Sequence, residues 1–136
     1  MQIIAAQDLI LLTWAQERLG VQWDAGQVRW LSGVADGSPV FVVVYSRFSA
    51  RNCELSIATD GTKRWATRRA LRAIFHIPFH QWKLRRVTFV INAENKVSID
   101  LCERLGAVRE GVVRKSFPDD ADGLVLGLLA EECPWC

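Results

Sequence analysis

The sequence predicts a single α/β domain, residues 1–136, built on a mixed and twisted sheet with helices on both faces. A chain of 136 residues suits one domain of ordinary size. Half of the residues are hydrophobic and 24% are charged, which is typical of a chain that buries a core. Strand-like and helix-like segments alternate along the chain, and about six strands are expected.

The N-terminal part predicts a helix followed by a hairpin. Apolar residues recur near helical spacing over residues 4–18, and Gly20 follows as a terminating residue. Two β-branched runs, 28–34 and 40–46, flank the turn sequence Ala-Asp-Gly-Ser-Pro. The second run does not alternate between apolar and polar residues, so we expect a strand that is covered on both faces.

The next part predicts a strand, a turn and a helix. The strand is expected over residues 53–59, and Asp60-Gly61 breaks it. Apolar residues at helical spacing predict a helix over residues 63–77, which Pro78 should end or bend.

The last part predicts the order strand, helix, strand, strand. A strand at 86–91 precedes a helix that Asn95 can cap and that Gly106 can close. The expected buried face of this helix consists of Val97, Leu101 and Leu105. Two closing strands are expected at 107–114 and 123–130.

Charge is unevenly distributed along the chain. Residues 61–93 carry a charge of +8 and no acid, whereas the whole chain carries +2, so the other segments together carry −6. A basic patch of this kind suits a phosphorylated ligand, either a nucleotide cofactor or a nucleic acid. No apolar run approaches the roughly 20 residues of a membrane span, and four cysteines are too few for a disulfide scaffold. We expect a cytoplasmic protein with reduced thiols and no membrane association.

A set of short motifs in the second half is more specific. Asn95 and Ser98 give N-x-x-S, Leu105-Gly106 begins L-G-F, and Glu110-Gly111 with Arg114 gives E-G-x-x-R. These motifs resemble the GNAT superfamily of acyl-CoA-dependent N-acyltransferases, especially the branch that acetylates the N-termini of ribosomal proteins. The resemblance covers roughly residues 28–130. Residues 126–135 are also similar to short acetyltransferases of phages and prophages, which would place the protein in a bacterial host cytoplasm.

The resemblance implies a GNAT-like fold, acetyl-CoA as the acyl donor, and an N-acetyltransferase that acts on a primary amine. The acceptor amine is left open among a protein N-terminus, a lysine and a small molecule. The diphosphate would bind at the turn before the second helix, because free N–H groups and the helix dipole favour anions there. In this turn, Arg64 stands where the resembled family usually has a glycine. Gly61 stands where that family usually has Gln or Arg. The implied cofactor-binding residues are Ser56, Ile57, Thr62, Lys63, Arg64, Trp65, Ala66, Thr67, Asn92 and Asn95.

Two residues are candidates for acid–base catalysis. Glu54 aligns with an acidic position that serves as a base in the family, and Ser98 would donate a proton to the departing thiolate. A purely structural interpretation stands beside each assignment: Asn95 with Ser98 is also an ordinary helix start, and Glu54 is also an ordinary strand carboxylate. Glu110 is a second candidate base. The family's tyrosine acid, expected near Cys102, is absent.

Other functions stay open at this stage. The unusual phosphate turn also suits a catalytically silent GNAT-fold protein with a structural or host-interaction role in a phage, and the basic stretch with its tryptophans also suits a nucleic-acid binder. Cys133 and Cys136 form a C-x-x-C without a following helix, so a redox role is not favoured. A metal site is not expected either, because His76 and His80 do not match a zinc pattern and Pro78 interrupts their register. Neither the acceptor amine nor the choice between monomer and homodimer is predicted.

Overall fold

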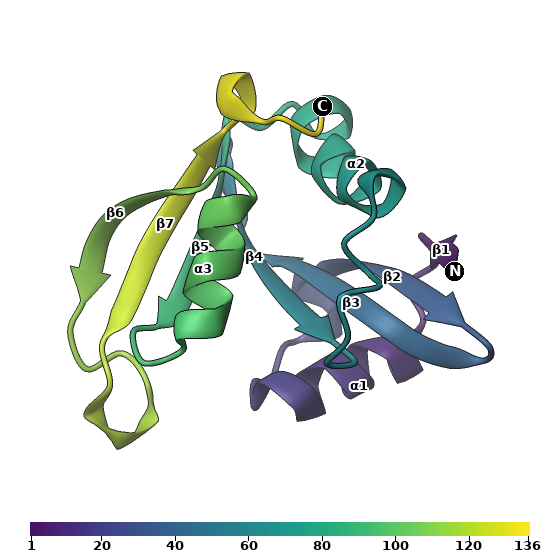
Figure 1. Ribbon diagram of the computed structural model, residues 1–136, viewed down its shortest axis with the longest axis horizontal. Helices are drawn as coiled ribbons and strands as arrows, with labels where there is room; N and C mark the ends of the chain where they lie inside the picture. Colours follow the sequence, from purple (N-terminus) through teal and green to yellow (C-terminus); the bar gives the residue numbers. More distant parts are fainter.

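Seven strands form one mixed sheet in the order β1-β2-β3-β4-β5-β7-β6 (Figure 1). The computed structural model describes residues 1–136. The strands are β1 (Gln2–Ile4), β2 (Arg29–Ala35), β3 (Ser38–Ser46), β4 (Asn52–Thr59), β5 (Arg86–Asn92), β6 (Val108–Val113) and β7 (Gly123–Leu129). All neighbouring strands are antiparallel except β4 and β5, which are parallel. The predicted hairpin is β2–β3.

Helices cover both faces of the sheet, as predicted. The helices are α1 (Leu9–Leu19), α2 (Arg68–His76) and α3 (Lys96–Arg104), and a π-helical turn, η2 (Ile77–Gln81), continues α2. α1 packs on one face with Val42 and Val44 of β3, whereas α2 and α3 pack on the other face with Val43 and Tyr45. Because these four side chains are fully buried, β3 is covered on both faces, and this expectation is confirmed. No helix is long and apolar enough to cross a membrane.

The N-terminal helix starts later than the sequence predicted. Residues 2–4 form the short edge strand β1, which pairs with β2, and α1 begins only at Leu9. The Asp8 side chain accepts a hydrogen bond from the Ile10 N–H at 2.9 Å and caps the helix there. A segment of three residues is too short to distinguish the helical period from the strand period, so the prediction of a helix from residue 4 was wrong at this end. Gly20 terminates α1 with a φ of 66°, as expected.

The second helix also starts later than predicted. Thr67 caps α2 by accepting a hydrogen bond from the Ala70 N–H at 3.1 Å, so residues 63–66 lie in the preceding turn and not in the helix. Pro78 does not stop the helical path outright. The chain passes from α2 into η2, where the Trp82 N–H donates to the Ile77 carbonyl at 3.0 Å.

The third helix has the predicted cap but a different buried face. The Asn95 side-chain oxygen Oδ1 accepts from the Ser98 N–H at 3.2 Å, as expected for an N-cap. Val97, which was expected in the core, is 81% exposed, and the buried residues are instead Ile99 and Cys102. Leu105, just after the helix, is buried as predicted.

The two parallel strands separate soon after they meet. β4 and β5 pair over only three positions, from Asn52 opposite Arg86 to Glu54 opposite Thr88. Beyond this pair the strands diverge, and Figure 1 shows β4 leading into the half with β1–β3 and β5 into the half with β6 and β7. The sheet is therefore splayed between β4 and β5.

Candidate active site at the splayed strands

The topology brings the predicted site residues to one end of the molecule. β4 and β5 run in the same direction, so the turns after them lie at the same end (Figure 1). This end is the open end of the splay, where the two strands have diverged. The first turn leads to α2 and the second to α3. The helix that follows each strand presents its N-terminus, the positive end of its dipole, after these turns.

The turn before α2, residues 59–67, holds several backbone donors without a protein acceptor. In this turn and the first turn of α2, five N–H groups donate to no protein atom: those of Lys63, Arg64, Trp65, Arg68 and Arg69. Gly61 provides the left-handed residue that the turn needs, with a φ of 89°. Because unpaired N–H groups at a helix start bind phosphate groups well, the turn has the chemistry of an anion site.

Asp60 places a negative charge inside the same turn. Its carboxylate accepts hydrogen bonds from the Thr62 N–H at 3.0 Å and from the Thr62 hydroxyl at 2.6 Å. It also accepts from Arg64 Nε and Nη2 at 3.1 and 2.9 Å. The hydrogen bonds from Thr62, helped by Arg64, lower the pKa of Asp60 to about 2, so it is ionised at neutral pH. The guanidinium of Arg64, predicted to bind phosphate, is thus already paired with an acid.

The other predicted residues of the turn differ in the solvent exposure of their side chains. The Trp65 side chain is buried and packs against Phe41, with ring centroids 6.2 Å apart, so only its backbone faces the turn. Thr62, Lys63 and Ala66 are exposed, and Lys63 is free to approach a ligand. Thr67 contributes its side chain to the helix cap.

The β4 strand offers a free backbone edge in the splay. Ser56 and Ile57 pair with Val44 and Val43 of β3, but they lie beyond the last pair with β5. Backbone groups of β4 that face β5 in this region therefore lack a partner strand. Such an edge binds extended amide-containing chains by the same hydrogen bonds that join strands.

Glu54 lies at the point where the strands part. Its side chain is 28% exposed, and its Oε2 lies 3.6 Å from Arg47 Nε. Burial raises the pKa of the Glu54 carboxyl, whereas the Arg47 guanidinium lowers it by a smaller amount. Cys53 and Leu55, its neighbours on β4, point into the α2–α3 core, so Glu54 points to the opposite face. Glu54 therefore keeps its proton to a higher pH than an exposed glutamate does.

On the other arm of the splay, Asn92, Asn95 and Ser98 surround the start of α3. The Asn92 side-chain oxygen accepts from the Glu94 N–H at 2.9 Å, and the Asn95 oxygen caps the helix. The Ser98 hydroxyl, half-buried in the first helical turn, makes no hydrogen bond to the protein. The capping role of Asn95 is confirmed, and the Ser98 hydroxyl is free to donate to a ligand.

No other side chain in this region is a suitable acid. The one tyrosine of the chain, Tyr45, is fully buried, and its hydroxyl donates to the Ile74 carbonyl at 2.7 Å. Burial raises the pKa of the Cys102 thiol to about 12. Glu110, the second candidate base, is paired with Arg86 at 2.5 Å on the side of the sheet formed by β5, β7 and β6.

Sequence reasoning missed two residues of this site, Asp60 and Arg47. An acid followed two positions later by threonine is a recognisable turn signal, because the carboxylate can accept from that residue's N–H, and this signal could have placed Asp60. Arg47 and Glu54 are seven residues apart in sequence. The β3–β4 register, in which Ser46 lies opposite Glu54, brings them together. No local pattern indicates this pair.

The predicted site residues do not line either of the two main pockets. One of about 480 Å³ lies beside α2, and one of about 290 Å³ lies beside Arg29, Phe48 and Trp82.

Comparison with known proteins identifies the fold. The sequence matches no protein-family model and no curated protein. The structure is similar to a chimeric spermidine N-acetyltransferase SpeG from Vibrio cholerae, with a TM-score of 0.77 and 15% identity, covering 96% of each chain. It is also similar to a GNAT-family acetyltransferase from Bacillus anthracis, with a TM-score of 0.64 and 22% identity over 80% of this chain and 70% of the other. The chain therefore has the GNAT acetyltransferase fold, as its motifs had suggested.

Proposed function

We propose that this protein is an N-acetyltransferase that transfers the acetyl group of acetyl-CoA to a primary amine. The observation that carries the proposal is the combination, at one splay, of a free β4 edge with an anion-binding turn before α2 and a free hydroxyl on α3. Acetyl-CoA has a diphosphate, an extended chain with two amides and a thioester, and each part has a matching group in this arrangement. The N–H groups of Lys63, Arg64 and Trp65 bind the diphosphate, and the β4 edge at Ser56 and Ile57 binds the amides.

Glu54 and Ser98 supply the proton transfers. An attacking amine must be neutral, which at pH 7 costs about 4.6 kcal/mol for a lysine but only about 1.4 kcal/mol for an α-amino group. Glu54, with its raised pKa, accepts the ammonium proton directly or through water. Ser98 donates its hydroxyl hydrogen bond to the sulfur that departs. Acetyl-CoA supplies the thioester that the amine attacks, and most of the rate enhancement comes from holding the two reactants together.

The surface near Glu54 favours an acceptor that is not a polycation. Arg47 contacts Glu54, and Arg29 lies across β3 from it at the same end of the sheet. The pocket at Arg29 is lined by Phe48 and Trp82 and contains no acid. Spermidine, named for the Vibrio cholerae proteins, carries several positive charges that these arginines would repel. We therefore favour the α-amino group of a peptide, in line with the ribosomal-protein branch that the motifs resemble.

A catalytically silent protein is the second candidate function, and Asp60 is the observation that favours it. Its carboxylate already accepts hydrogen bonds within the turn that would hold the diphosphate. In that case the GNAT fold serves as a scaffold, in a phage structural or host-interaction role, and binds no acyl donor.

Two measurements separate these candidates. Calorimetric titration with acetyl-CoA reports binding, and thiol release in the presence of amines reports transfer. Our proposal predicts one saturable site and faster thiol release with peptide N-termini than with spermidine. Arg64→Glu should weaken binding, whereas Arg85→Glu, the same charge change at the closed end of the splay, should not. Saturable binding without thiol release from any amine would support the silent alternative, and no binding at millimolar ligand would remove the enzymatic proposal.

A further inference from the structure

One side of α2 and η2 carries a row of basic side chains, the basic row. Arg68, Arg72, His76 and His80 follow one another at intervals of four residues, so they lie along one side of the helix, and all four are exposed. Pro78 was expected to spoil the register of the two histidines, but the chain continues through η2, and their rings stack with centroids 5.0 Å apart. The row is about 18 Å long, because each helical residue adds about 1.5 Å.

The positive charge of this part of the chain is largely not neutralised within the protein. Of the eight lysines and arginines in residues 61–93, only Arg64 and Arg86 form ion pairs. The other three ion pairs of the protein lie outside this stretch. No acid occurs between Asp60 and Glu94. A surface with unpaired cations and no acid attracts a partner with several negative charges.

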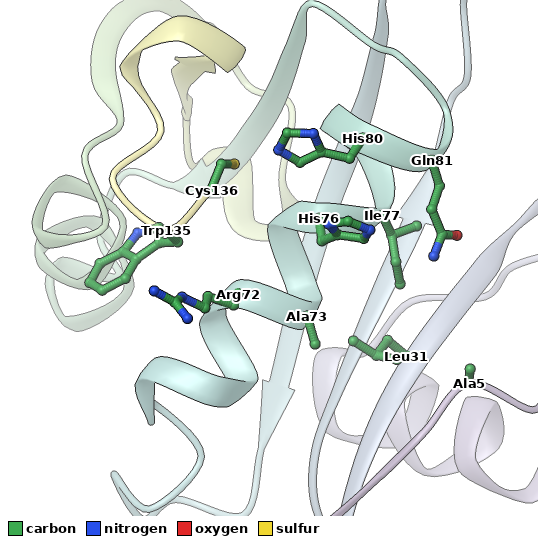
Figure 2. Close-up of a pocket in the computed structure, with 10 residues that line it drawn as sticks. All are labelled: Ala5, Leu31, Arg72, Ala73, His76, Ile77, His80, Gln81, Trp135 and Cys136. Atoms are coloured by element: carbon green, nitrogen blue, oxygen red, sulfur yellow. The ribbon is translucent and has the colours of Figure 1, made fainter.

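A pocket of about 480 Å³ lies beside the basic row. Arg72, His76 and His80 line it, and no acidic side chain does. Trp135 also lines the pocket, and its indole is held in place because the indole N–H donates to the Leu105 carbonyl at 3.0 Å. Figure 2 shows the Arg72 side chain extending toward this indole. Aromatic and imidazole rings beside cations are typical of surfaces on which the unpaired bases of nucleic acids stack.

We propose that the basic row and this pocket bind a single-stranded nucleic acid. The phosphates of the strand lie along the row, and one unpaired base enters the pocket and stacks against the paired imidazoles. An acidic polypeptide would be attracted by the same charge, but it has no bases for the rings to stack on, and a duplex keeps its bases paired inside. The rings therefore favour an unpaired strand. The pocket lies at the C-terminal end of α2, whereas the proposed diphosphate turn precedes the N-terminal end.

The test is fluorescence anisotropy with a labelled oligo(dT) strand of 12 nucleotides, measured at several salt concentrations. Binding should weaken as salt rises, and the contacts of two arginines alone predict a loss of about sevenfold between 50 and 200 mM salt. Arg72→Gln should lower the steepness of this salt dependence by about 0.7 on logarithmic scales, the contribution of one phosphate contact. The matched control is Arg18→Gln, the same charge change on α1, which packs on the opposite face of the sheet and should leave the salt dependence unchanged.

A second strand of the same length with abasic units in place of every base reports on the pocket. It should bind about 10-fold more weakly than oligo(dT), and combining His76→Ala with His80→Ala should remove most of this difference. Both histidines are exposed, so the variant should fold, and circular dichroism checks this.

The proposal is overturned if oligo(dT) does not bind at 50 mM salt, or if Arg72→Gln and Arg18→Gln show the same salt dependence. It is also overturned if the abasic strand binds as tightly as oligo(dT). Polyglutamate of equal charge that displaces the labelled strand as well as unlabelled oligo(dT) does would identify an acidic polypeptide as the partner instead. All of these measurements are made without acetyl-CoA, so their outcome does not depend on acetyl transfer.

Discussion

The hydrogen bond from Tyr45 to Ile74 offers a prediction whose size follows from the structure. Tyr45 lies near the C-terminal end of β3 with a fully buried side chain, and its hydroxyl donates to the Ile74 carbonyl at 2.7 Å. In an α-helix that carbonyl would accept from residue 78, but residue 78 is proline and has no N–H. The tyrosine therefore satisfies a carbonyl that the helix cannot, and it ties α2 to the sheet.

We predict that Tyr45→Phe lowers the free energy of unfolding by about 1–3 kcal/mol, the cost of a buried carbonyl without its donor. The ring stays, so its edge-on contact with Trp82, at 5.1 Å between centroids, is retained and no cavity forms. Urea unfolding should show a lower midpoint with an unchanged slope. Acetyl transfer per folded molecule should be unchanged, because this tyrosine is not the catalytic acid.

The matched control is Thr13→Val in α1. The Thr13 hydroxyl donates to the Leu9 carbonyl at 2.9 Å, but it is exposed, so water replaces the lost bond. We expect a loss below about 0.5 kcal/mol for this variant. Equal losses for Tyr45→Phe and Thr13→Val, or no loss for Tyr45→Phe, would refute the reasoning.

Three further predictions concern the site. Ser98→Ala should slow thiol release by about 100-fold, because it removes the proton donor to the leaving group. Calorimetry should show unchanged acetyl-CoA binding. An unchanged rate of thiol release would exclude Ser98 as the acid. The rate should rise with pH as Glu54 loses its proton, and Arg47→Ala should move this rise to higher pH, because Arg47 lowers the pKa of Glu54. A pH–rate profile that does not move would exclude Glu54 as the base. Asp60→Asn should strengthen acetyl-CoA binding in calorimetry, because it removes the negative charge from the diphosphate turn. Weaker binding would mean that Asp60 holds the turn in its binding shape, contrary to this account.

The sequence predicted most of the fold because its periodic patterns were long and its turn residues were distinctive. The β2–β3 hairpin, the cap at Asn95 and the terminating Gly20 each have a local chemical cause, and each was confirmed. Short segments were harder. Residues 2–4 fit a helix or a strand equally well, and pairing with β2 decides for the strand.

The buried face of α3 shows a different limit. Val97 follows the expected periodicity, but the cap at Asn95 and the packing on β5 turn Ile99 and Cys102 inward instead. Tertiary contacts of this kind outweigh a pattern of three apolar residues.

The site was predictable where residues are close in sequence and not where strand register brings them together. The turn at 59–67 and the start of α3 carry motifs that can be read along the chain. The contact between Arg47 and Glu54 depends on strand register, and the pairing of Arg64 with Asp60 depends on side-chain geometry.

The most direct test of the central claim compares calorimetric titrations with acetyl-CoA and with S-acetylpantetheine, which lacks the diphosphate together with the adenosine and its 3′-phosphate. If the N–H groups of residues 63–65 bind the diphosphate, acetyl-CoA should occupy one site and S-acetylpantetheine should bind about 100-fold more weakly, the equivalent of two charge-assisted hydrogen bonds. Equal affinities for the two compounds, or no binding of acetyl-CoA at millimolar concentration, would contradict the account.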